Sequence, residues 1–153
     1  MLLVSSDPID AAAELRAFEA MALQAGGIVT FSGQVREAAA SGQVTSLYLQ
    51  AYSPMTENGI QAAITEANAR WDLEQTRVIH RTGAMQPGET IVFVATAAKH
   101  RRAAFEAADF LMDYLKTEAV FWKKEDTETG SNWIEPRAAD YSDANRWTKK
   151  EDA

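Results

Sequence analysis

The chain has 153 residues, of which 46% are hydrophobic and 24% are charged, which suits a single domain spanning residues 1–153. It contains no cysteine, which excludes disulfides, thiolate nucleophiles and cysteine-bound metal, and with only two histidines we expect no metal ion or other cofactor. The net charge of −7 argues against general binding of nucleic acid.

The N-terminal stretch does not look like a targeting segment. MLLVSSDPID has no basic region and only a short apolar start, unlike a signal peptide. The longest strongly apolar run, residues 91–98, is too short to cross a bilayer. We therefore expect a cytoplasmic protein with no membrane partner.

The first half of the chain predicts strands and two helices. After a short apolar strand, Asp7 and Pro8 predict an N-cap and a first helical residue, and this helix is expected to end at the Gly26-Gly27 pair. Residues 28–35 and 44–52 alternate like strands, and the small-residue loop between them is expected to be mobile. Ser53-Pro54 predicts a second helix start, and the apolar face of that helix comprises Ile60, Ile64, Ala67 and Trp71.

The second half predicts a helix between two pairs of strands. Residues 76–83 and 90–98 form the first pair, with a turn at residues 86–89. A helix over about residues 101–116 has a buried face of Ala104, Ala108, Leu111 and Leu115, flanked by Phe105 and Met112. AVFWKKE and WIEP predict a hairpin, and residues 138–153 are polar except for Tyr141 and Trp147. Without regular βαβ alternation, this order predicts an α+β fold with a mainly antiparallel sheet.

Basic residues cluster where a helix normally prefers acidic ones. Lys99, His100, Arg101 and Arg102 fall at the predicted start of the third helix, whose partial positive charge they oppose. A bound phosphate or carboxylate would relieve this conflict. Equally, the side chains could extend into water or pair with acids such as Glu106. His80 lies in a predicted strand, where we expect a structural role.

Two lysines follow near the end of the same helix. Lys116 suits a last-turn cation that interacts with the helix dipole, and Lys123 suits a solvated strand residue. Alternatively, both lysines point into one anion pocket, where neighbouring cations lower a lysine pKa and make a neutral amine available near pH 7. The spacing of the two residues in the sequence does not decide between these interpretations.

Five segments together match one known family: FSGQVR (31–36), HRTGAMQPGE (80–89), IVFVATAAKHRRAAFEAADFLMDYLKT (91–117), FWKKE (121–125) and WIEPR (133–137). The long block ending in MDYLKT, followed shortly by FWKKE, is highly specific. On these residues the chain resembles the catalytic, large subunit of molybdopterin synthase. The resemblance implies an α/β hammerhead fold with an additional antiparallel β-sheet.

The resemblance also implies an activity and partners. Family members form a homodimer with a small ubiquitin-like sulfur carrier at each end, giving a heterotetramer. The carrier's C-terminal Gly-Gly is a thiocarboxylate, which supplies two sulfurs to cyclic pyranopterin monophosphate and so forms the dithiolene of molybdopterin. A sulfur donor on another chain fits a sequence without cysteine.

By resemblance, Lys116 lies beside the incoming thiocarboxylate and Lys123 is a candidate general acid or base. The implied substrate-contacting residues are Gln34, Val35, Arg36, His100, Arg101, Lys124, Glu125 and Arg137, the last supplied across the dimer. The chain departs from the family at three positions. Val120 replaces a common proline, Gln50 an acidic residue and Glu37 a neutral polar one, so local geometry is in question there.

Two other functions are compatible with the residues. One is a non-catalytic adaptor that binds a ubiquitin-like tail, although retention of Lys116, Lys123 and Arg101 argues against it. The other is a regulatory domain that binds nucleotides or other anions. Turnover of the pterin precursor would separate the enzyme from both.

Overall fold

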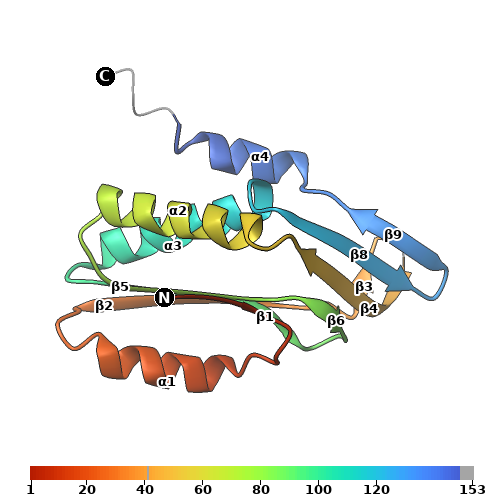
Figure 1. The fold of residues 1–153 in the computed structure, drawn as a ribbon, viewed down its shortest axis with the longest axis horizontal. Helices are drawn as coiled ribbons and strands as arrows, with labels where there is room; N and C mark the ends of the chain where they lie inside the picture. The colour runs from red at the N-terminus through yellow and green to blue at the C-terminus, as the bar shows by residue number, and fades with distance from the viewer. Residues whose placement is uncertain (41, 149–153) are drawn as a thin grey trace.

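Strand β7 (Thr90–Ala98) lies in the middle of the first of two sheets in this computed structural model, which describes residues 1–40 and 42–148. The order is β1 (Leu2–Ser5), β5 (Leu73–Arg81), β7 and β2 (Gly27–Gln34). β1 runs parallel to β5, and the other two pairs are antiparallel. Helix α1 (Ala11–Met21) covers one face, and α2 (Met55–Arg70) and α3 (Arg101–Thr117) cover the other (Figure 1).

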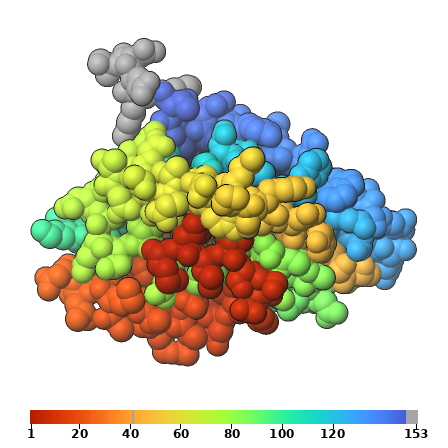
Figure 2. Space-filling view, in the orientation of Figure 1, coloured from red at the N-terminus to blue at the C-terminus, as the bar shows by residue number. Residues whose placement is uncertain are grey.

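Alternation along the central strands fills a core on each face of this sheet. Val78, Val92 and Val94 pack with apolar residues of α2 and α3, whereas Ile79 and Phe93 pack with Phe18 of α1. In the space-filling view, the N-terminal residues lie between α1 and α2 (Figure 2). The two sides of the first sheet are therefore both buried, and the site residues described below come from the ends of its strands, from α3, from the second sheet and from the C-terminal segment.

The second sheet is antiparallel and continues away from the first (Figure 1). Its order is β3 (Ala38–Ala39), β4 (Gly42–Ala51), β8 (Phe121–Thr127) and β9 (Gly130–Ile134), and β6 (Gly83–Met85) also pairs with β4. Its inner face packs Leu47, Leu49 and Met85 with Val35 and Phe121. The chain then ends with α4 (Ala138–Asn145).

The α+β fold with an additional antiparallel sheet is confirmed, with some element boundaries corrected. The first helix begins at Ala11, where the Asp10 carboxylate accepts from Ala13 N–H, and it ends at Met21. Asp7-Pro8 and Gly26-Gly27 were therefore wrong predictions for its start and end, because a better cap lies three residues after Asp7. Trp71 is the residue after α2, although it still packs against the same core.

The predicted faces of α2 and α3 are largely confirmed. Ile60, Ile64 and Ala67 are buried, as are all four predicted core residues of α3. Phe105, in contrast, is exposed. Part of the expected loop at residues 36–43 pairs as the small strand β3, and its mobility stays a prediction. No helix among the residues that the structure describes is long and apolar enough to span a membrane, and the cytoplasmic location also stays a prediction.

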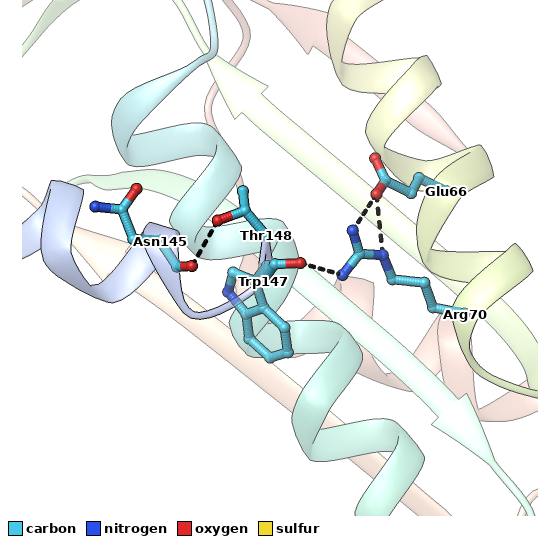
Figure 3. A network of polar contacts seen from close by, with 5 residues as sticks. All are labelled: Glu66, Arg70, Asn145, Trp147 and Thr148. Atoms are coloured by element: carbon cyan, nitrogen blue, oxygen red, sulfur yellow. Dashed lines mark hydrogen bonds and ion pairs between the residues drawn. The ribbon is translucent and has the colours of Figure 1, made fainter. Parts of the chain in front are cut away.

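Helix α4 was missed in the polar C-terminal segment, of which residues 149–153 lie outside the described residues. What anchors this segment to α2 and α3 is Trp147, whose indole packs edge-on against Trp71 and Phe110 and donates to Asp113 Oδ2 at 2.6 Å. Its carbonyl accepts from Arg70 Nη1 at 2.9 Å, and Arg70 in turn bonds to Glu66 (Figure 3). Trp147 thus anchors a polar stretch, and Arg146 adds ion pairs to Asp109 and Asp113 of α3 at 2.7 and 2.8 Å.

The Gly26-Gly27 pair determines how closely the start of α3 approaches β2. Gly26 N–H donates to Ala98 O at 3.0 Å, and a Cβ added at Gly26 would lie 2.2 Å from Lys99 O. At Gly27 the nearest atom to an added Cβ would be Arg101 Cα at 3.3 Å. The two glycines therefore leave room for the backbone that carries the basic cluster.

We predict that Gly26→Ala lowers the free energy of unfolding by roughly 1–3 kcal/mol, because the new methyl group meets a backbone carbonyl that cannot move alone. Gly27→Ala is the matched control, and we expect it to cost less than about 1 kcal/mol, since its contact needs only a small shift. Urea unfolding measures both. Equal losses in the two variants would contradict the close-approach explanation.

Candidate active site

Two lysines from different elements border the same cavities. Lys116 lies in the last turn of α3, and Lys123 lies in β8, opposite Leu49 of β4. Both line a cavity of about 580 Å³ and an adjoining one of about 390 Å³. Arg36, which follows β2, also lines both cavities. The structure therefore places together the three cations that the sequence left apart.

The environment of Lys123 favours a neutral amine. Burial, together with the nearby positive charge of Lys116, lowers its pKa to about 8, while Asp140 acts in the opposite direction. A pKa of about 8 leaves roughly a tenth of the side chain unprotonated at pH 7. Such a lysine can exchange protons with a substrate near neutral pH.

An ion pair from α4 forms part of the wall of the larger cavity. Asp140 is only 8% exposed, and its carboxylate accepts from the Arg137 backbone N–H at 2.8 Å and from its Nη2 at 3.0 Å. These hydrogen bonds lower the pKa of Asp140, with a smaller contribution from Lys116. The resemblance implies that Arg137 comes from a partner chain, whereas this structure places it beside its own chain's lysines.

The segment from Gln34 to Arg36 is fixed through its middle residue. The Val35 side chain is buried in the core of the second sheet, so its predicted contact with substrate could involve only its backbone. Val35 N–H donates to Glu89 O at 3.0 Å, and Val35 O accepts from Gly88 N–H at 2.8 Å. Buried Arg81 holds the Glu89 side chain by an ion pair of 2.9 Å. This turn therefore fixes where Gln34 and Arg36, both exposed, enter the site.

The basic cluster lies at the other end of α3 from the lysines. His100 is the N-cap of the helix, without a side-chain capping bond, and Arg101 is its first residue. Fifteen residues of helix separate the Cα atoms of Arg101 and Lys116 by about 22 Å. The predicted single pocket that unites His100 and Arg101 with both lysines is therefore not formed within one chain. Glu106 accepts from Trp71 Nε1 at 2.7 Å, and the described residues include no Arg102–Glu106 ion pair.

Lys124 and Glu125 differ in which face of β8 they occupy. Lys124 lies opposite Tyr48 and Trp133, on the face turned away from Lys123, and its Nζ is 3.8 Å from Asp126. Glu125 shares the face of Lys123. In the described part of the chain, it does not line the groove along α3 or either of the two lysine cavities. Their substrate contacts stay predictions.

The connection between the two lysines is held by a residue that the sequence analysis did not single out. Thr56, in the first turn of α2, is 1% exposed, and its hydroxyl donates to Val120 O at 2.6 Å while accepting from Tyr52 N–H at 2.8 Å. This bond anchors the backbone at the position where the family commonly has proline. Gln50 lies opposite Trp122 on the outer face of the sheet, away from the cavities that Lys123 borders.

A longer groove leads to the lysines along α3. It has a volume of about 900 Å³ and reaches from Arg101 and Arg102 to Lys116. Phe31 and Phe105, both exposed, give it an apolar wall together with Met112. The groove and the two lysine cavities meet at Lys116, which lines all three.

Comparison with known families identifies the family of this chain. A family model described as MoaE protein matches residues 4–118. The chain belongs to the MoaE family. A curated relative named molybdopterin synthase catalytic subunit, from Cereibacter sphaeroides, is 47% identical over 146 residues, which cover 95% of this chain and 99% of the relative.

Solved structures show the same fold. A molybdopterin biosynthesis MoaE protein from Burkholderia ambifaria superposes with a TM-score of 0.82 at 37% identity, covering 98% of this chain and 99% of that one. A chain from a complex of subunits 1 and 2 of molybdopterin-converting factor from Helicobacter pylori has a TM-score of 0.74 at 20% identity, covering 89% and 91%. The second likeness shows the fold alone.

We predict that Lys123→Met stabilises this MoaE protein by on the order of 1–3 kcal/mol at pH 7, because an ammonium group is no longer buried beside Lys116. In the wild type, the pKa of Lys123 rises from about 8 in the folded state to 10.5 in the unfolded state. Between these values the unfolded state binds more protons, so wild-type stability increases with pH and the advantage of the variant shrinks.

Urea unfolding at pH 7 and pH 10 measures this difference. Lys124→Met is the matched control, since its side chain lies on the other face of β8, and its stability relative to wild type should change little with pH. A difference between Lys123→Met and wild type that is the same at both pH values would contradict a lowered Lys123 pKa.

Proposed function

We propose that this chain is the catalytic subunit of a molybdopterin synthase, a transferase of molybdenum cofactor biosynthesis. It takes sulfur from the thiocarboxylated C-terminus of a small ubiquitin-like carrier and adds two sulfurs to cyclic pyranopterin monophosphate, whose cyclic phosphate opens. Membership of the MoaE family and the name of its 47% identical relative support the reaction class. The proposal assigns no metal ion or other cofactor to this chain.

The observation that carries the proposal is the pair of lysines at one cavity. Lys123, with a pKa of about 8, can serve as general acid or base at neutral pH. Lys116, at the junction of the cavities and the groove, is placed to meet an incoming carrier tail and to stabilise negative charge that develops on a thiocarboxylate or phosphate. In this proposal Lys123 transfers protons to or from the reacting atoms, and Lys116 stabilises their negative charge.

Arginines at the same cavities suit the phosphate of the substrate. Arg36 borders both cavities, and Arg137 borders the larger one. A guanidinium group can bind phosphate through two parallel hydrogen bonds. Arg137 is already paired with Asp140, so we propose that it exchanges this carboxylate for the substrate phosphate.

The groove along α3 suits the carrier's tail. An extended Gly-Gly terminus needs a narrow channel, and the groove between Phe31, Phe105 and Met112 leads to Lys116. In the Helicobacter pylori structure, a chain with this fold belongs to a complex of subunits 1 and 2 of molybdopterin-converting factor. We assign the tail to this groove and the pterin to the two lysine cavities.

We also propose the homodimer, and with two carriers the heterotetramer. The outer face of the second sheet exposes Tyr48, Trp122 and Trp133, and the two tryptophan rings meet edge-on with centroids 5.7 Å apart. Exposed aromatic patches of this kind mark protein interfaces.

Because His100 and Arg101 lie about 22 Å along α3 from Lys116, we propose that they serve the site of the second copy.

Activity tests the assignment of the lysines. With thiocarboxylated carrier and cyclic precursor, the wild type should form a dithiolene pterin, and we expect Lys116→Ala and Lys123→Ala each to lower the rate by at least ~100-fold. The wild-type rate should rise with pH up to about 8 if the neutral Lys123 amine acts as base. Lys99→Ala, at an exposed lysine outside these cavities, is the control.

Carrier binding without turnover in the wild type would instead support the adaptor function. Nucleotide binding without precursor binding would support a regulatory domain. Unchanged yields in both lysine variants would contradict the roles assigned to them.

A mixed dimer tests whether His100 and Arg101 act across the interface. We expect Lys123→Ala and Arg101→Ala homodimers to be inactive, and co-expressed chains to regain about a quarter of wild-type activity, since half the dimers are mixed and each has one intact site. If Arg101 served its own chain's site, every site in the mixture would carry one defect. Complete inactivity of the mixture would therefore contradict the arrangement across the dimer.

A further inference from the structure

His80 belongs to the wall of the lysine cavity, although the sequence predicts only a structural role for it. Its side chain lies on β5 and is only 3% exposed. It lines the cavity of about 390 Å³ together with Gln34, Arg36, Lys116 and Lys123. A nearly buried imidazole at a cavity of cations calls for a functional explanation.

The ring of His80 is held on two sides. It stacks on Phe121 with ring centroids 4.1 Å apart and an interplanar angle of 21°, and Phe121 shares its face of β8 with Lys123. Its Nδ1 lies 3.0 Å from Arg81 O. One ring face and the Nδ1 edge are therefore occupied, so the part of the ring that remains to border the cavity is the opposite edge, which carries Nε2, or the other face.

The protonation state of the ring follows from these contacts. A carbonyl oxygen can only accept, so Nδ1 carries the hydrogen and Nε2 has a free lone pair whenever the ring is neutral. Burial, with a smaller effect from the charges of Lys123 and Lys116, lowers the pKa of His80 to about 4, although the bond to Arg81 O acts in the opposite direction. Among the described residues that line this cavity with the ring, the charged ones are the cations Lys116, Lys123 and Arg36.

Nothing in the described part of the chain donates a hydrogen bond to Nε2 of His80. The cations around it supply donors for an anionic substrate, whereas a neutral imidazole supplies an acceptor. Its low pKa makes it a poor general base near pH 7, because a catalytic base works best with a pKa close to the working pH. Binding, rather than proton transfer, is the role that remains.

We infer that Nε2 of His80 accepts a hydrogen bond from a ring or amine N–H of the bound pterin, and so orients the substrate against Lys123. This inference rests on the proposed function, because it takes its ligand class from it. The stack on Phe121 fixes the acceptor relative to the β8 backbone, so the same strand positions the lysine and the group that orients its substrate. His80 is thereby a specificity residue for N–H-bearing heterocycles.

Two variants separate this role from packing. His80→Phe keeps an aromatic ring against Phe121 but removes the acceptor, and we expect it to raise KM for the cyclic precursor roughly tenfold. His80→Gln offers a side-chain oxygen that can accept, and it should recover part of that loss. Affinity for the carrier should be unchanged in both, since the carrier's tail lies in the groove along α3.

Nitrogen-15 NMR of labelled histidine tests the hydrogen bond in the unaltered protein. The chain has only two histidines, so a His80→Phe spectrum assigns both sets of signals. We expect a neutral His80 with a hydrogen on Nδ1, and an upfield shift of its Nε2 signal when the cyclic precursor is added without carrier. An Nε2 signal that does not move at saturating precursor would overturn the inference even if the variants fail to fold.

The outcomes also separate this inference from the proposed function. Wild-type turnover, combined with an unmoved Nε2 signal or with unchanged KM in His80→Phe, would refute the role of His80 alone. Wild type that neither binds nor converts the precursor would refute both. A tenfold rise in KM, rescued in part by His80→Gln, together with the Nε2 shift, would establish the assignment.

Discussion

Two ammonium groups that approach each other in a partly buried cavity are the constraint on which this site depends. Burial disfavours the charge on Lys123, and Lys116 adds repulsion, so the arrangement exists only because other contacts hold both residues in place. Lys116 is fixed by the buried Leu111 and Leu115 on the same helix, and Lys123 by ladders to β4 on one side and β9 on the other. The packing of α3 and the pairing of β8 therefore offset the unfavourable free energy of holding these two charges close together in the site.

The supports for this cavity come from distant parts of the chain. Thr56 of α2 holds the carbonyl of Val120, Glu89 of the turn before β7 holds Val35, and Asp140 of α4 holds Arg137. Each is a hydrogen bond to the backbone or to a charged group. Val120 and Val35 are each next to a residue that lines a cavity, and Arg137 lines the larger cavity itself. Preorganised groups of this kind spare the reaction the cost of rearranging its surroundings.

Periodicity alone predicted the elements that carry the site but not the way in which they meet. The 3.6-residue repeat of Leu111 and Leu115 gave α3 its buried face and placed Lys116 correctly in the last turn. The approach of Lys123 depends on pairing between β8 and β4, which are far apart in the sequence, and no local pattern encodes that register. Only the family resemblance indicated that the two lysines converge.

The missed residues had weak local signals for identifiable reasons. His80 sits in a strand, where a single histidine usually has a structural role, and its link to Phe121 is a contact between two sheets. Asp140 and α4 lie in a polar stretch whose anchors to α3, Arg146 and Trp147, follow the helix. Gly26 was taken for a helix stop because a glycine pair predicts that structure equally well, whereas its close approach to Lys99 O appears only in three dimensions.

The same physical causes lower the pKa of both Lys123 and His80, and an anionic substrate would act on both in the opposite direction. Negative charge near the cavity cancels the repulsion from Lys116 and favours the protonated amine of Lys123. His80 stays neutral under the same change, because burial is the main cause of its low pKa and its starting value of about 4 lies far below neutrality. Substrate binding would therefore favour the protonated form of Lys123 while His80 stays neutral and able to accept a hydrogen bond. In this way the smaller lysine cavity, whose described lining includes no acidic residue, can present one group that donates a proton and one that does not.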